Sequence, residues 1–117
     1  MREERSFGIQ FMANNEFSRD ASGRLTFEMF RAPADHYREI CAAIATAFDL
    51  VPEKSPITNG VDIVFQDYRR GEQVVGLEWD NWSGFMVVAK TPDTESLVRE
   101  IADWLLQSGW CTGRDPA

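Results

Sequence analysis

Hydrophobic residues alternate with polar ones in five segments, and this period of two is typical of half-buried β-strands. The segments centre on Ile9, Phe27, Ile63, Leu77 and Val87. Residues 13–23 lie between the first two and are rich in Asn, Ser, Asp and Gly, which favour turns. We therefore expect a long loop there, held down by Phe17, between two antiparallel strands. The last three segments predict a meander with turns at 69–71 and 81–84.

Two other segments repeat their hydrophobic residues every three or four positions, as amphipathic helices do. The first spans residues 33–49, and its apolar stripe is Tyr37, Ile40, Cys41, Ile44, Ala45 and Phe48. The second begins after Thr91, and its stripe is Leu97, Val98, Ile101, Ala102 and Leu105. Pro33 and Pro92 suit a first helical turn, where an N–H would have no partner. Gly109 suits the left-handed residue that ends a helix.

The resulting order of elements is ββαβββα. It predicts an α+β fold, a five-stranded, mainly antiparallel sheet with both helices packed on one face. The length of 117 residues and the hydrophobic share of 44% are those of one self-sufficient domain, so residues 1–117 are expected to form a single domain.

The sheet face opposite the helices is predicted to be partly apolar. If Val75, Leu77 and Trp79 face the helices, the other face carries Val64, Val74, Met86 and Val88, with Met12 and Phe30 at its margin. Large exposed apolar patches are rare in monomers. Two explanations stay open: either the loop at 13–23 or the tail from Trp110 covers this face, or a homodimer or another partner does.

The charge balance excludes several classes of partner. Nineteen acidic and twelve basic residues give a net charge of −7, which disfavours phosphate backbones and anionic membranes. The start of the chain does not have the pattern of a signal peptide, and no apolar run is long enough for a membrane span, so a cytoplasmic protein is expected. Cys41 and Cys111 form no CxxC pair, which predicts reduced thiols, no disulfide framework and no zinc site.

Functional side chains are densest in residues 76–84. Glu78 and Asp80 are two apart on a predicted strand, so they share a face and could converge on a basic side chain, a cation or a proton-transfer task. Two carboxylates alone do not supply the oxygen ligands that a divalent ion prefers, and solvated strand-end acids are the plain alternative. Trp82, in the following turn, is the tryptophan expected to be exposed.

Other reactive residues have ordinary structural explanations. His36 lies near a helix start, Cys41 lies on an apolar stripe, and Arg69 and Arg70 lie at a hairpin turn. No nucleotide-binding, metalloprotease, calcium or nucleophile-elbow motif occurs. No residue is therefore assigned a catalytic, cofactor-binding or metal-binding role, and a non-enzyme is favoured.

Small size and acidity lead to the hypothesis of a protein-binding domain. Its concrete form is an immunity-type neutraliser of a basic protein, with a homodimer through the second sheet face as a further hypothesis. The residues expected to meet the partner are Glu78, Asp80, Trp82, Asp67 and Glu72. The alternative is a small-ligand-binding protein or enzyme that uses an acidic cleft around Glu78 and Asp80.

Overall fold

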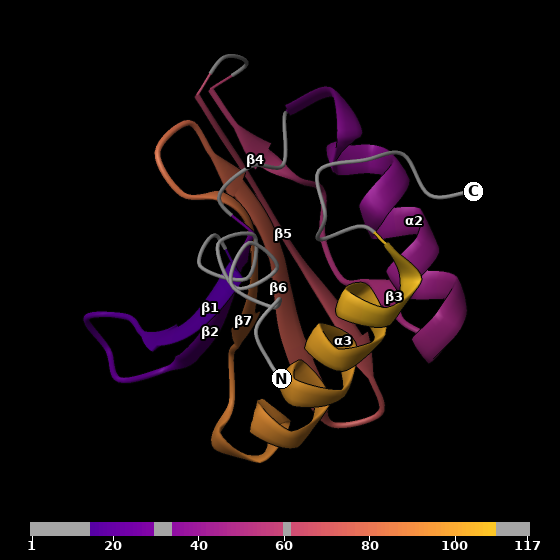
Figure 1. Ribbon diagram of the computed structural model, residues 1–117. Coiled ribbons are helices and arrows are strands. Elements are labelled where there is room, and N and C mark those ends of the chain that lie inside the picture. The colour runs from indigo at the N-terminus through magenta and orange to yellow at the C-terminus, as the bar shows by residue number, and fades with distance from the viewer. Residues whose placement is uncertain (1–14, 30–33, 60–61, 110–117) are drawn as a thin grey trace, which may run out of the picture.

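The computed structural model describes residues 15–29, 34–59 and 62–109, which form one antiparallel sheet with two helices on one of its faces (Figure 1). The strands are β1 (Asn15–Arg19), β2 (Leu25–Met29), β3 (Val51–Pro52), β4 (Ile57–Thr58), β5 (Ile63–Arg70), β6 (Gln73–Asp80) and β7 (Gly84–Ala89). The helices are α2 (Tyr37–Phe48) and α3 (Glu95–Ser108), preceded by the 3-10 turns Ala34–His36 and Pro92–Thr94. The strand order is β1-β2-β7-β6-β5-β3, and β4 also pairs with β5.

The predicted α+β class, the two helices and four of the five predicted strands are confirmed. The strand predicted around Ile9 lies outside the described residues. The structure has seven strands in its described part, because β1, β3 and β4 occur where no strand was expected. β3 and β4 are two residues long and carry no alternating pattern that a sequence could show.

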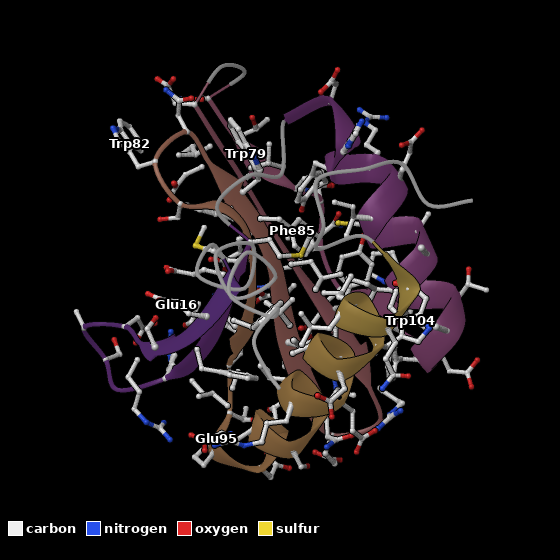
Figure 2. All side chains as sticks on the ribbon, viewed as in Figure 1. Glu16, Trp79, Trp82, Phe85, Glu95 and Trp104 are labelled. Carbon is white, nitrogen blue, oxygen red and sulfur yellow. The ribbon has the colours of Figure 1, made fainter. Side chains whose placement is uncertain are left out.

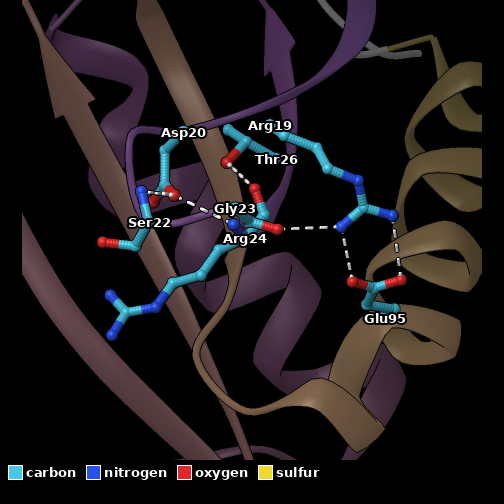
Figure 3. Close-up of polar contacts among 7 residues, drawn as sticks. All are labelled: Arg19, Asp20, Ser22, Gly23, Arg24, Thr26 and Glu95. Carbon is cyan, nitrogen blue, oxygen red and sulfur yellow. Dashed lines mark hydrogen bonds and ion pairs between the residues drawn. The ribbon is translucent and has the colours of Figure 1, made fainter.

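The β1–β2 hairpin corrects the prediction of a loop at 13–23. Phe17 pairs directly with Phe27 of β2, and their ring centroids are 5.1 Å apart. In the described part of the segment the turn follows β1: the Asp20 carboxylate accepts hydrogen bonds from the N–H groups of Ser22 and Arg24, both 2.9 Å long (Figure 3). Turn-forming residues within β1 are thus overridden by cross-strand pairing.

The ion pair between Arg19 and Glu95 joins this hairpin to α3. Arg19 Nη1 lies 2.7 Å from the carboxylate and also donates to the carbonyl oxygen of Gly23 at 2.9 Å (Figure 3). Phe17 adds a cation–π contact, with the guanidinium of Arg99 5.5 Å from the ring centroid. These contacts orient the hairpin relative to the helical layer.

The core lies between the helices and the inner face of the sheet. Both predicted helical stripes turn inward: α3 buries all five of its predicted residues, and α2 buries Tyr37, Ile40, Cys41 and Ile44. The strands contribute Leu25, Phe27, Met29, Val75, Leu77, Trp79, Phe85, Val87 and Ala89. The hydroxyl of Tyr37 donates to the carbonyl oxygen of Leu77 at 2.5 Å, which fixes the start of α2 on the sheet.

The register of β5 corrects the predicted sheet faces. A turn at residues 69–71 would pair Phe65 with Val75, but the actual turn at Gly71 and Glu72 pairs Phe65 with Glu78. Because side chains alternate between faces, this odd shift exchanges the two faces of β5. Val64, which was expected on the outer face, packs against the core instead.

Outer-face apolar residues of β7 are buried. Met86 is 8% exposed and Val88 5%, and neither belongs to the core cluster between sheet and helices. The predicted margin residues Met12 and Phe30, and the tail from Trp110, lie outside the described residues.

The second helix ends as its sequence predicts, but its α-helical part begins later than expected: the 3-10 turn Pro92–Thr94 follows Thr91, α3 starts at Glu95, and neither Thr91 nor Thr94 caps a helix through its side chain. Thr91 has an extended backbone conformation, its carbonyl oxygen accepts the N–H of Thr94, and its hydroxyl contacts the Asp93 carboxylate at 2.6 Å. Gly109 ends α3 with a φ of 91°. Neither helix has the length and apolarity that crossing a membrane requires, as far as the described ranges extend.

Candidate functional site

Three of the five predicted partner-binding residues share the outer face of the sheet. Glu78 and Asp80 lie there on β6, and Asp67 joins them from β5 because it pairs with Gly76. Glu72 lies in the turn at the other end of β6, about 25 Å from Asp80 at the usual rise per residue. The structure therefore does not bring Glu72 to the same site as Asp80 and Trp82.

Lys90 neutralises part of this acidic face. Its ammonium lies 2.7 Å from the Glu78 carboxylate and 3.7 Å from that of Asp67. Gly76 makes the contact possible, because a Cβ there would lie 2.5 Å from Lys90 Cε and 2.7 Å from Glu78 Oε2. The Glu78 side chain is only 13% exposed, so most of its charge is held by this lysine and less is offered to a partner.

A groove of about 300 Å³ lies beside the Lys90 ion pairs. Its lining residues are Lys54, Ser55, Ile57, Phe65, Gln66, Asp67, Glu78 and Lys90, a set without Asp80. Two lysines balance two carboxylates, so this groove lacks the acidic character that the cleft hypothesis assumed. The sequence analysis did not consider Lys90, which directly follows the last predicted strand; the pairing of β6 with β7 places it beside Gly76.

Asp80 orders the turn that carries Trp82. The Asp80 carboxylate accepts the backbone N–H groups of Trp82 at 2.9 Å and Ser83 at 2.6 Å. A further backbone bond joins Asn81 N–H to the carbonyl oxygen of Asp62, and Gly84 has the positive φ of 75° that closes such a turn. Trp82 is 73% exposed and projects from this turn, away from the sheet (Figure 2). The backbone of Trp82 is thus ordered, while its side chain stays largely exposed to solvent.

Glu16 and Glu28 add two carboxylates to the same outer face, two residues along the strands from this turn. They face each other across β1 and β2, and the next residue in their row is Met86 of β7. Partial burial of Glu28 raises the pKa of its carboxyl, and the negative charges of Glu16 and Asp80 raise it further. The sequence reasoning missed both residues because it placed Glu16 in a loop. We call the surface of Glu16, Glu28, Asp80 and Trp82 the acidic end of the sheet.

The other residues that the sequence analysis considered have structural partners or lie away from the acidic end of the sheet. Arg69 is ion-paired with Glu53, and Arg70 donates to the carbonyl oxygen of Phe48 at 3.4 Å. His36 lies in the 3-10 turn before α2, on the helical side of the sheet. Across the described ranges, no three His, Cys, Asp or Glu side chains are grouped to hold a metal ion.

A second hollow of about 500 Å³ lies on the helical side, between α2, β4 and β5. Tyr37, Cys41 and Tyr68 form its inner wall. Burial raises the pKa of the Cys41 thiol to about 11, although the neighbouring hydroxyl groups of Tyr37 and Tyr68 act the other way, and burial raises the pKa of Tyr68 to about 12. At neutral pH Cys41 is therefore a protonated thiol with little nucleophilic character.

The Lys90 ion pairs predict a specific stability effect. We expect Lys90→Met to lower the free energy of unfolding by about 1–3 kcal/mol, because Glu78 would keep its charge without a partner. The double variant Lys90→Met/Glu78→Gln should regain part of this loss. Urea denaturation measures both. The control is Arg19→Met, which removes an ion pair whose two side chains are 50% and 32% exposed, so that water screens it and the loss of stability should be clearly smaller. Equal losses for the two single variants would contradict the assignment.

The raised pKa of Glu28 predicts that the free energy of unfolding depends on pH. Because its pKa in the folded state lies above the ordinary 4.5, the folded state binds more protons than the unfolded state just above that pH. The contribution of Glu28 to the free energy of unfolding therefore falls as pH rises through that window. Glu28→Gln should raise the free energy of unfolding at pH 7 relative to the original protein, and the difference should disappear near pH 3. Glu100→Gln, on the exposed face of α3, is the matched control. An identical pH profile for the two variants would refute the effect.

Comparisons of this chain with protein-family models, with curated proteins and with solved structures gave no match.

Proposed function

We propose that this chain is a protein-binding domain that docks a basic partner on the acidic end of its sheet. The observation that carries the proposal is Trp82, a large side chain that is 73% exposed on a turn ordered by Asp80. Tryptophan is enriched among the residues that dominate protein interfaces. A turn that is already ordered costs less entropy when a partner binds.

The charges around Trp82 favour a cationic partner. Asp80, Glu16 and Glu28 form no ion pair with a lysine or arginine of the described ranges. Burial raises the pKa of Glu28, and repulsion from Glu16 and Asp80 raises it further. A bound lysine or arginine would relieve this repulsion. Opposite charges on the two proteins would also speed their association, more so at low ionic strength.

The proposal revises the set of contact residues. Asp80 and Trp82 are kept, whereas Glu78 and Asp67 contribute less because Lys90 neutralises them. Glu72 lies too far along β6 to belong to the same contact. Glu16 and Glu28 take their place.

The specific form that we propose is a cytoplasmic neutraliser of a basic protein, similar in role to an immunity protein. A neutraliser needs an exposed, ordered and highly charged surface, and it needs no catalytic residue. The competing proposal, a small-ligand protein or enzyme that uses Glu78 and Asp80 together, is less favoured because the groove beside Glu78 excludes Asp80 and is charge-balanced.

Affinity capture from extracts of the native host tests the binding surface. Trp82→Ala and the double variant Glu28→Gln/Asp80→Asn should each lose a basic protein that the original chain retains, and 0.3 M salt should weaken its retention. Asparagine at position 80 keeps an oxygen that can accept the two turn hydrogen bonds, so this variant changes charge with little change in shape.

Two matched controls separate the site from general effects. Ile57→Ala removes another exposed apolar side chain, 67% exposed on β4, and Glu100→Gln/Asp103→Asn removes the same two charges from α3. Both controls should retain the partner. Retention of the same proteins by all four variants would overturn the site, and a captured protein whose toxicity is unaffected by co-expression would overturn the neutraliser form.

We further propose that a homodimer, if formed, uses the outer face of β5 and β6. Ile63, Phe65 and Val74 are partly exposed there, whereas Met86 and Val88 are buried. Light scattering over a range of concentrations should show a dimer mass that Phe65→Glu reduces to the monomer, with Trp82→Ala as a control that leaves it unchanged. A monomer mass at all concentrations would exclude the dimer.

A further inference from the structure

The hollow between α2, β4 and β5 has the size and lining of a small-molecule pocket. Its volume of about 500 Å³ is within the range in which proteins bind small ligands. Val64 and Tyr68 line it from β5, Cys41 and Ala42 from α2, and Pro56 from the segment before β4. It lies on the helical side of the sheet, so it is separate from the outer-face surface proposed above for protein binding.

The polar groups of the inner wall already have partners. The Tyr37 hydroxyl donates to the carbonyl oxygen of Leu77 at 2.5 Å, and the Cys41 thiol lies beside the hydroxyl groups of Tyr37 and Tyr68. All three groups are neutral at pH 7, because burial raises their pKa values. The interior therefore suits an apolar or aromatic group that needs no hydrogen bond of its own.

The mouth of the pocket carries two opposite charges. Asp35, in the turn before α2, and Arg38, in its first turn, both line the pocket and are exposed. Their spacing of three residues places neighbouring side chains about 5–6 Å apart on a helical surface. No ion pair is formed by either side chain within the described ranges, including with each other. Both charges are thus available to a ligand at the pocket entrance.

We propose that this pocket binds a free α-amino acid with an aromatic or large aliphatic side chain. The side chain occupies the apolar interior, the carboxylate meets the guanidinium of Arg38, and the ammonium meets the carboxylate of Asp35. A zwitterion matches both charges at the mouth, whereas a simple acid or amine would leave one of them beside a bound apolar group. This inference does not depend on the proposed protein-binding function.

Three probes that share one ring test the charge requirement. L-phenylalanine carries both charges, 3-phenylpropionate only the carboxylate, and 2-phenylethylamine only the ammonium. We expect L-phenylalanine to bind about tenfold tighter than either of the others, since each charged contact adds a charge-assisted hydrogen bond. Titration with amide NMR spectra of the 117-residue chain should show shifts confined to residues around the pocket, such as Ala42 and Tyr68.

Two single variants at the pocket mouth should each weaken the binding of a different pair of probes. Arg38→Gln should weaken L-phenylalanine and 3-phenylpropionate about tenfold and leave 2-phenylethylamine unchanged, and Asp35→Asn should weaken the two ammonium probes instead. Both positions are exposed, so both variants should fold. Ala42→Phe, which adds a ring at the exposed mouth, should block all three probes. Arg24→Gln, in the β1–β2 turn, is the control that leaves all affinities unchanged.

Clear results would overturn the proposal. It fails if L-phenylalanine causes no shift at 10 mM, if the shifts lie away from the pocket, or if Ala42→Phe leaves binding intact. It also fails if the three probes bind equally well, or if Arg38→Gln and Asp35→Asn affect all probes alike. None of these outcomes bears on Trp82 or on the acidic end of the sheet.

Discussion

The pairing of β5 with β6 determines what each side of this protein can do. Arg70 lies opposite Gln73, and the register that follows extends without interruption to Ile63 opposite Asp80. Gly71, with a φ of 63°, allows the tight turn that sets this register. Because a shift by one residue would move every side chain of β5 to the other face, the core, the pocket and the outer charges all depend on it. Tyr68 reaches the pocket wall, and Asp67 reaches Lys90, only in this register.

Electrostatics divides the outer face into two regions of different character. Over Gly76 the ammonium of Lys90 lies between Glu78 and Asp67, so that region is charge-balanced. Toward the β6–β7 turn, the pKa of Glu28 is raised first by partial burial and further by the negative charges of Glu16 and Asp80. Asp80 has a second task there, since its carboxylate holds the backbone that presents Trp82. Asp80 thus contributes negative charge to the surface proposed for binding and also orders the turn that carries Trp82.

The two proposed sites lie on opposite faces of one sheet. The acidic end uses outer-face side chains of β1, β2 and β6 together with a turn, whereas the pocket uses α2 and the inner face of β5. Separate faces let a change at one site leave the other intact, which is why matched variants can test each alone. The same separation allows a bound small molecule to stabilise the α2–β5 packing without touching the protein-binding surface.

The sequence by itself determined the helices, four strands and the direction in which the helical stripes point. These features are local: the period of hydrophobic residues decides them, and the stripes of α2 and α3 are buried as their spacing predicts. It also placed Glu78 and Asp80 on one face and identified Trp82 as exposed. Tertiary structure alone decided that 15–19 is a strand, because pairing with β2, including Phe17 against Phe27, offsets the turn preference of those residues. It alone decided that Lys90 neutralises Glu78, that Glu16 and Glu28 join Asp80, and that Tyr68 meets Cys41. Each of these contacts joins residues whose proximity depends on strand order and register, which a one-residue difference in turn length can reverse.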